Sequence, residues 1–195
     1  MATKQNKETR GQFKAVRDSL SESDRREFSR AASDRFLALL DNYKEANIFL
    51  CFYPFGSEIE FIPTYKRLLE EGKELYFPVS DIGGHQLHFL KVSDLEKDFH
   101  EGAYGIMEPN DSLSELKDFE KDIIAITPGL IFDENCNRCG YGAGFYDRFF
   151  AKYPNIIKIG VAYDSQVVKQ LETREYDIPL DYLVTNNRLI KRGRL

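Results

Sequence analysis

The amino-terminal part of the chain has hydrophobic residues at helical spacing. Three of them recur every three or four positions and predict a first helix: Phe13, Val16 and Leu20. Ser21 and Ser23 are suited to cap a second helix, which the pattern extends to about Tyr43. One face of that helix is apolar and consists of Phe28, Ala31, Ala32, Phe36, Leu39 and Leu40. The remaining positions carry arginines that we expect to be solvated: Arg25, Arg26, Arg30 and Arg35.

From residue 47 onward, predicted strands alternate with predicted helices. The aromatic and β-branched run from Asn47 to Tyr53 predicts a buried strand that ends at a Pro/Gly loop. A short helix over residues 62–69 follows, then a strand over 75–79. Residues 87–92 alternate only weakly, as is typical of an edge strand, and Gly83-Gly84 predicts the turn before them.

The second half continues this alternation after a charged stretch. Residues 93–121 contain Gly and Pro breakers, and we interpret them as a surface excursion with short helical turns. Beyond them, the pattern predicts strands over 123–126, 156–163 and 182–185, the last followed by a basic tail, and a helix over 145–153. The alternation favours an α/β fold, a three-layer α/β/α sandwich with a largely parallel sheet, whose ligands bind at the carboxyl ends of the strands.

Length and composition narrow the function classes. A chain of 195 residues predicts a single domain over residues 1–195, in which residues 80–120 could form a small lobe. The net charge of −5 argues against broad nucleic-acid binding. No apolar run approaches the roughly 20 residues of a membrane span. The polar amino terminus lacks a secretory signal and the three cysteines are scattered, so we expect a cytoplasmic protein, and we expect it to be a monomer.

The segment most informative about chemistry is rich in glycine. Gly140, Gly142 and Gly144 alternate just before the helix predicted over residues 145–153. Glycines permit positive φ and close backbone approach, so consecutive N–H groups can converge on a phosphate near a helix amino terminus. The pattern is neither a P-loop nor a dinucleotide fingerprint. The glycines alone therefore leave two interpretations open, a phosphate cradle or a tight strand-to-helix turn.

Charged neighbours favour the cradle. Arg138 and Arg148 bracket the glycines and can supply positive charge to phosphate oxygens. Asp133 and Asp147 offer hard oxygen ligands for Mg²⁺, which typically bridges phosphates. Their proximity within sixteen residues makes binding of a nucleoside triphosphate the interpretation we favour.

These residues resemble a known family, the 5-formyltetrahydrofolate cyclo-ligases. The family's Pro-Gly-x-x-Phe-Asp element is similar to Pro128–Asp133, and its Arg-x-Gly-x-Gly-x-Gly-x-Tyr-Asp-Arg element to Arg138–Arg148. The resemblance covers nearly the whole chain, in the same order, through Tyr53-Pro54-Phe55-Gly56-Ser57-Glu58-Ile59-Glu60, Gly105-Ile106-Met107-Glu108-Pro109, Ile159-Gly160-Val161-Ala162-Tyr163 with Gln166, and Tyr176-Asp177-Ile178-Pro179-Leu180-Asp181 with Val184-Thr185. It implies a fold similar to sugar-phosphate isomerases and CoA transferases.

The resemblance also implies an activity. Family members convert 5-formyltetrahydrofolate and ATP to 5,10-methenyltetrahydrofolate, ADP and phosphate, with Mg²⁺. The formyl oxygen first accepts the γ-phosphoryl group, the folate N10 attacks the activated carbon, and phosphate leaves. Such phosphoryl transfer depends mainly on positioning and on charge neutralisation.

Site residues follow from the resemblance position by position. The ATP loop is implied at Arg138, Cys139, Gly140, Tyr141, Gly142, Ala143, Gly144, Phe145 and Tyr146. Part of it, Tyr141, Gly142, Ala143, Gly144 and Phe145, is implied to line the folate site as well, together with Tyr53 and Glu58. The metal carboxylates are implied at Asp147 and Asp177, and we assign catalytic roles to Arg148 and Asp133.

At the amino terminus, the family pattern is Lys-x-x-x-Arg, a contact to nucleotide phosphate. Arg10 matches the arginine, but Asn6 stands at the lysine position. Lys7 lies one residue later, about 100° around a helix, so that either Lys7 reaches the phosphate with its flexible stem or this contact is lost.

Other interpretations of the chain remain open. Cys136 and Cys139 with His85 and His88 could form a zinc-binding module, although the two cysteines lie within the nucleotide motif. A sugar-phosphate isomerase or transferase of similar architecture is a further alternative, because fold does not fix function. A relative that binds folate and nucleotide without catalysis is a third, with Asn6 as its main support.

Overall fold

The structure is a computed structural model that describes residues 2–3, 7–102, 105–120 and 122–193. Its centre is a seven-stranded sheet in the order β14-β13-β10-β7-β2-β3-β4. The strands are β2 (Ile48–Leu50), β3 (Glu74–Asp81), β4 (Gln86–Val92), β7 (Ile123–Thr127), β10 (Ile157–Ala162), β13 (Tyr182–Thr185) and β14 (Leu189–Lys191). The five inner strands pair in parallel, and the edge strands β4 and β14 are antiparallel to their neighbours. The predicted α/β fold with a largely parallel sheet is confirmed.

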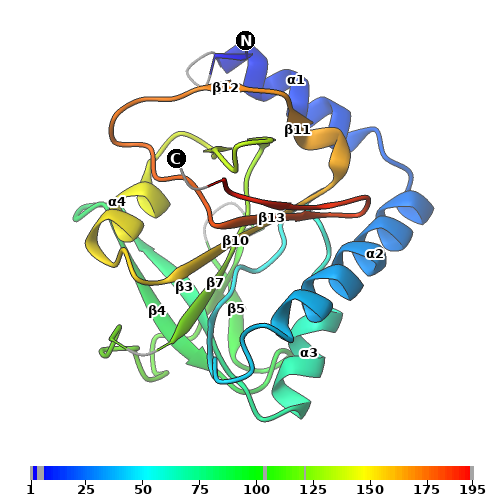
Figure 1. Cartoon of the computed structure of the whole chain (residues 1–195). Helices are drawn as coiled ribbons and strands as arrows, with labels where there is room; N and C mark the ends of the chain where they lie inside the picture. Colours follow the sequence, from blue (N-terminus) through cyan, green and yellow to red (C-terminus); the bar gives the residue numbers. More distant parts are fainter. Residues whose placement is uncertain (1, 4–6, 103–104, 121, 194–195) are drawn as a thin grey trace.

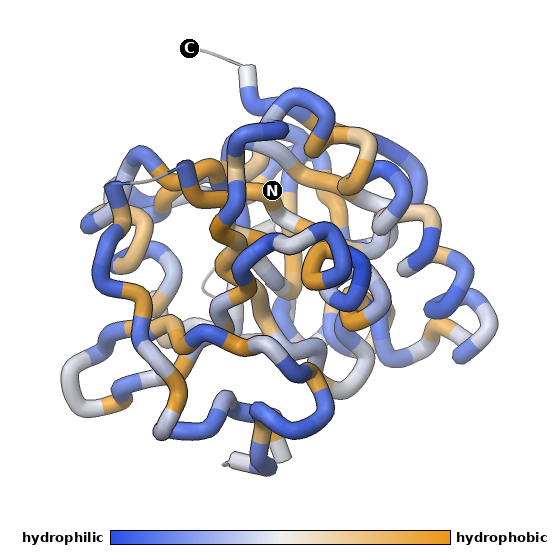
Figure 2. Tube along the Cα trace, turned by 90° about the horizontal axis from the view of Figure 1, so that it is seen from below, coloured by the Kyte–Doolittle hydropathy of each residue, from blue (hydrophilic) through white to orange (hydrophobic). Residues whose placement is uncertain are grey.

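Helices cover both faces of this sheet (Figure 1). The helices of the described chain are α1 (Lys7–Asp18), α2 (Glu22–Leu40), α3 (Ile62–Glu70) and α4 (Phe145–Lys152), with a 3-10 turn, η2, at Asp164–Gln166. The helices α2 and α3 pack on one face, and α4 packs on the other. In Figure 2 hydrophilic and hydrophobic residues alternate along the peripheral segments, as expected of elements with one face on a core.

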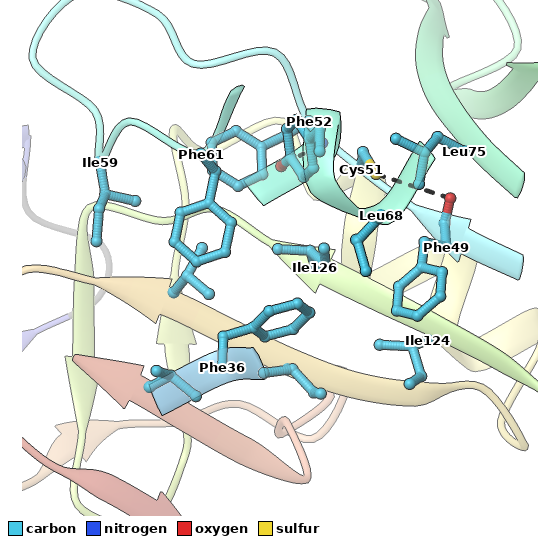
Figure 3. Packing of buried hydrophobic residues seen from close by; sticks show 14 of the residues in the cluster. Phe36, Phe49, Cys51, Phe52, Ile59, Phe61, Leu68, Leu75, Ile124 and Ile126 are labelled. Carbon is cyan, nitrogen blue, oxygen red and sulfur yellow. Dashed lines mark hydrogen bonds between the residues drawn. The ribbon is translucent and has the colours of Figure 1, made fainter. Parts of the chain in front are cut away.

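Local sequence explains where these elements begin and what they bury. The Ser21 side chain accepts a hydrogen bond from the Asp24 backbone N–H at 3.0 Å and caps α2, as predicted. Every residue of β2 and β7 is buried, which is why both read as continuous hydrophobic runs. Figure 3 shows Phe36 of α2 and Phe61 packed over Ile126 of β7; the two aromatic rings meet edge to face, 5.6 Å apart.

Several short strands were not predicted from the sequence. The strands β8 (Ile131–Asp133), β9 (Arg138–Cys139) and β11 (Val167–Val168) form a small sheet, and β1 (Ala2–Thr3) pairs with β12 (Leu171–Glu172). The prediction that the strand over 182–185 is the last one was wrong, because the segment taken as a basic tail includes β14. The β8–β9 sheet matters for function, since it carries the chain into the glycine-rich loop.

The stretch from 93 to 121 also differs from its expectation. Where described, it contains the antiparallel hairpin β5 (Phe99–Glu101) and β6 (Met107–Pro109), in place of a succession of helical turns. Phe99 and Leu116 are buried against the two core clusters, so this stretch is anchored to the sheet and is not merely a surface excursion.

The arginines of α2 are not all solvated either. Arg26 and Arg30 are exposed, as expected. Arg35 is half-buried, and it donates a hydrogen bond to the carbonyl of Asn186, just beyond β13. The Nε atom of Arg25 is buried and makes no hydrogen bond within the described part of the chain. The helical period identified the apolar face of α2 but could not show which of its arginines make buried or tertiary contacts.

Candidate functional site

A cavity of about 680 Å³ lies at the carboxyl edge of the parallel strands. Pro78 and Ser80 line it from the second half of β3, and Pro128 lines it directly after β7. Most of its wall is the segment singled out in the sequence, from Arg138 to Arg148. The rest of the lining consists of Arg10, Leu87, Ala151, Arg174, Tyr176 and Asp177. The cavity therefore occupies the place where parallel α/β sheets bind ligands.

Two backbone conformations shape the glycine-rich loop. Gly144 has φ of 69° and stands as the left-handed residue immediately before α4, and Gly142 has φ of 107°. L side chains rarely adopt such angles, so these positions favour glycine. Together they turn the chain from β9 into α4 and bring its first residues, Phe145 to Asp147, to the cavity, where the unpaired N–H groups of a helix start.

Three arginines fill the space that side chains at the glycines would take. A Cβ atom at Gly142 would lie 2.7 Å from Nη1 of Arg10, and one at Gly140 would lie 2.7 Å from Nη1 of Arg138. A Cβ atom at Gly144 would lie 3.0 Å from Nη1 of Arg148. The glycines thus let three guanidinium groups approach the loop backbone, and the result is a positively charged, N–H-rich surface.

Each of these arginines comes from a different structural context. Arg138 is buried on β9; its Nη2 lies 3.5 Å from Asp147 Oδ2, and its guanidinium lies 5.0 Å from the centre of the Tyr146 ring. Its Nε is buried and has no hydrogen-bond partner among the described residues. Arg148 is exposed on α4, and its Nε donates to the carbonyl of His85 at 3.0 Å.

Two carboxylates face the same cavity. Asp147 Oδ1 accepts a hydrogen bond from the Ile178 backbone N–H at 3.2 Å, which ties α4 to the segment that carries Asp177. Asp177 Oδ2 accepts one from the Arg174 backbone N–H at 2.7 Å. Mg²⁺ is usually held by one or two carboxylates together with substrate phosphates. This pair fits that requirement, since both residues line the cavity beside the positively charged loop.

Asp133 does not belong to this group, contrary to its assignment as a catalytic residue. It is fully buried at the end of β8 and does not line the cavity. Its carboxylate accepts hydrogen bonds from the backbone N–H groups of Asn135, Asn137 and Leu171 and from the Asn137 side chain, at 2.8–3.0 Å. Asp133 instead fixes the turn between β8 and β9, and so the entry into the glycine-rich loop.

Glu58 and Tyr53 lie outside the cavity lining, on the loop that follows β2. Glu58 contacts the glycine-rich loop, because the Tyr141 hydroxyl donates a hydrogen bond to its Oε1. Burial raises the pKa of Glu58 above its ordinary value, although its hydrogen bonds and the charge of Arg17 act against that rise. Tyr53 packs edge to face on Phe99, with the ring centres 4.8 Å apart, and is half-buried.

Sequence reasoning missed Arg17, which is buried at the end of α1 and contacts Glu58 and Tyr141. A signal was available. Arg17 lies four residues after Phe13 and three before Leu20, so helical spacing places it on the apolar face that these two residues define. Lys7 begins α1, but its side chain and Asn6 lie outside the described part of the structure, so the prediction for Lys7 stays a prediction.

The zinc interpretation finds no support. The described residues include no group of three or more His, Cys, Asp and Glu side chains arranged to hold a metal ion. Cys136 and Cys139 are buried and form no disulfide, and burial raises the pKa of Cys136 to about 12, which disfavours the thiolate that a metal or a redox reaction needs. His88 pairs with Glu115, at 2.6 Å.

The fold and the cavity together define an α/β protein with a candidate anion site at the carboxyl edge of its sheet, lined by a glycine-rich loop, arginines and two carboxylates. Within the described chain, no helix is long and apolar enough to cross a membrane. Residues 2–186 match the profile of the 5-formyltetrahydrofolate cyclo-ligase family. The chain belongs to this family.

Individual relatives agree with this membership. The chain is 29% identical to the 5-formyltetrahydrofolate cyclo-ligase of Haemophilus influenzae over 94% of its own length and all of that protein. It is 30% identical to the Escherichia coli enzyme over 71% of its length and 77% of the relative. The solved 5,10-methenyltetrahydrofolate synthetase of Aquifex aeolicus superposes with a TM-score of 0.79 at 31% identity, covering 95% of this chain and 93% of the other.

Proposed function

We propose that the family reaction takes place at the cavity beside the glycine-rich loop, and that this loop holds the phosphates of ATP. The activity itself follows from the family: the chain is a 5-formyltetrahydrofolate cyclo-ligase, and the family's ligases depend on ATP. The observation that carries the assignment of the site is the juxtaposition of three glycines with three guanidinium groups at the amino terminus of α4.

The loop suits phosphoryl transfer because that reaction requires positioning and charge neutralisation more than covalent chemistry. In our proposal the γ-phosphoryl group moves to the formyl oxygen of the folate, and the folate N10 then displaces phosphate as the ring closes. Arg10, Arg138 and Arg148 compensate charge on the phosphate oxygens, and the N–H groups of α4 donate hydrogen bonds to them.

Asp147 and Asp177 would hold Mg²⁺ in this arrangement. When bound, the ion would neutralise charge on the phosphate oxygens. In the absence of the ion, the ion pair with Arg138 holds the Asp147 carboxylate in place at the cavity.

The folate half of the site lies on the other side of Tyr141. We propose that Glu58 accepts hydrogen bonds from the N–H groups of the pterin and that Tyr53 packs against its ring. The hydrogen bond from the Tyr141 hydroxyl to Glu58 then connects the nucleotide-binding loop to the folate-binding residues. Residues 141–145 can contact both substrates from this position.

The decisive experiment measures formation of the methenyl product by its absorbance, with and without ATP. Arg10→Gln should raise the KM for ATP about tenfold or more, because one charge-assisted contact to phosphate is lost. Lys14→Gln is the matched control, since it removes an exposed cation from the same helix without touching the cavity. ATP-independent product, or equal ATP kinetics for the two variants, would refute the proposed site.

We also propose that the enzyme is a monomer and acts in the cytoplasm. The three cysteines, all in the described part of the chain, form no disulfide, which suits a reducing compartment. A relative in Arabidopsis thaliana, 26% identical over 72% of this chain, is described as mitochondrial, so fractionation of cells that express the tagged chain is the direct test of location. Light scattering of the purified protein tests the oligomeric state.

A further inference from the structure

Arg17 is buried, and the proposed reaction does not require it to touch either substrate. Only 2% of its side chain is exposed, so its charge must be matched by partners inside the protein. Its Nε donates to the Ser57 hydroxyl at 3.0 Å, its Nη2 donates to the Tyr141 hydroxyl at 3.2 Å, and its Nη1 lies 3.7 Å from Glu58 Oε1. Ser57 in turn donates to Asp18.

These contacts join three distant parts of the chain. Arg17 belongs to α1, Ser57 and Glu58 to the loop after β2, and Tyr141 to the glycine-rich loop. A planar guanidinium can serve several acceptors in fixed directions at once, whereas a lysine ammonium at this place would act as a point charge. Arg17 therefore holds the loop that carries Glu58 against the Tyr141 hydroxyl, at one end of the glycine-rich loop.

The contact between Arg17 and Glu58 matters because Glu58 is buried, and burial affects whether its side chain carries a charge. Its side chain is 8% exposed, and such burial favours the protonated form. The Tyr141 hydroxyl, the charge of Arg17 and the backbone N–H of Phe55 stabilise the carboxylate instead. A carboxylate accepts hydrogen bonds at both oxygens, whereas a protonated carboxyl group uses one of them as a donor.

We propose that Arg17 is a positioning residue for folate: its guanidinium orients the Glu58 carboxylate for the pterin and holds the Tyr141 hydroxyl against it. The inference rests on the proposed role of Glu58 in folate binding. Arg17 acts through Glu58, so loss of either residue should have nearly the same effect on the folate and little effect on ATP.

A double-mutant cycle tests this directly. Binding of 5-formyltetrahydrofolate is measured by calorimetry without ATP, for Arg17→Gln, Glu58→Gln and the double variant, and the KM for ATP is measured in parallel. Each single variant should raise the folate Kd about tenfold or more, as loss of a hydrogen bond to a charged group would. The double variant should be within about twofold of the weaker single variant, because the two residues form one unit.

Three further measurements separate this role from a merely structural one. The KM for ATP should stay within about twofold of the wild-type value in each variant. Arg17→Lys retains the charge but not the fork, so its folate Kd should lie between those of the wild type and Arg17→Gln. Arg26→Gln, which alters an exposed cation of the next helix, α2, should bind folate like the wild type.

The outcomes distinguish this inference from the proposed function. An unchanged folate Kd in Glu58→Gln refutes the folate role of Glu58, and the inference falls with it. A raised Kd in Glu58→Gln together with an unchanged Kd in Arg17→Gln refutes the inference alone, as does an effect of the two substitutions that is fully additive. If Arg17→Gln does not fold, the comparison of Arg17→Lys with Glu58→Gln decides in the same way.

Discussion

Gly142→Ala tests the geometry of the glycine-rich loop with a single methyl group. The added Cβ atom would lie 2.7 Å from Nη1 of Arg10, whereas ordinary contacts of this kind are about 3.5 Å, so the guanidinium must retreat by about 0.8 Å. The φ of 107° adds backbone strain of about 1–3 kcal/mol. If Arg10 loses a charge-assisted contact to phosphate, about 1.5–3 kcal/mol of ATP binding is lost. The expected result is a decrease of about 10- to 100-fold in kcat/KM for ATP.

Two other glycines separate the causes of this decrease. Gly72 also has positive φ, 78°, but a Cβ atom there would meet nothing within 4 Å, and Gly11 has neither strain nor contact. Gly72→Ala should therefore lower the unfolding midpoint without changing the ATP kinetics, and Gly11→Ala, in the helix α1, should be neutral or slightly stabilising. The assay is the initial rate of methenyl product formation against ATP concentration at saturating folate. A kcat/KM for ATP in Gly142→Ala within twofold of the wild type would refute the assigned role of Arg10.

Three other predictions follow from the site. Asp147→Asn should raise the Mg²⁺ concentration for half-maximal rate about tenfold, because an amide is a weaker ligand for Mg²⁺ than a carboxylate. The unfolding midpoint should stay nearly unchanged, because the amide oxygen can still accept the Ile178 N–H. Equal Mg²⁺ titrations of the variant and the wild type would contradict the metal assignment. The KM for folate should fall as pH rises through the raised pKa of Glu58, since the ionised form is the acceptor, and a pH titration of Glu58→Gln should lack this step. Asp133→Ala should destabilise the fold by about 3 kcal/mol or more in urea unfolding, because four N–H donors lose their acceptor, and a variant with normal stability but no activity would restore a catalytic role.

Regular elements of the fold were predictable where burial leaves a simple pattern. The strands β2 and β7 are covered on both faces, and a continuous hydrophobic run identifies such a strand. The helix α2 has a capping serine and a periodic apolar face. By contrast, β9 and β11 have two residues each, too few for any period, and the pairing of β11 with β8 joins segments that lie 35 residues apart, Val167 with Phe132.

The site was predictable to the extent that its residues are contiguous in the sequence. The motif placed Arg138, Asp147 and the glycines together, and the structure brings them to one cavity. It could not show that the carboxylate of Asp133, within the same motif, accepts hydrogen bonds from backbone N–H groups of β12 and the β8–β9 turn. Nor could it show that Arg17 points inward, because a helical arginine is usually solvated and its partners lie 40 and 124 residues away.

The way α1 is attached has a consequence for how the enzyme is made and handled. Within the described part of this helix Arg17 is the one buried residue, so α1 adheres through polar contacts and a few half-buried side chains, not through the main core. An element held in this way can detach at low free energy while the sheet stays folded. During synthesis, α1 can make its contact with Tyr141 only after residue 141 has been added to the chain. A preparation clipped or fused at its amino terminus could thus melt as a native protein does and still be inactive, and a thermal melt alone would not reveal the damage.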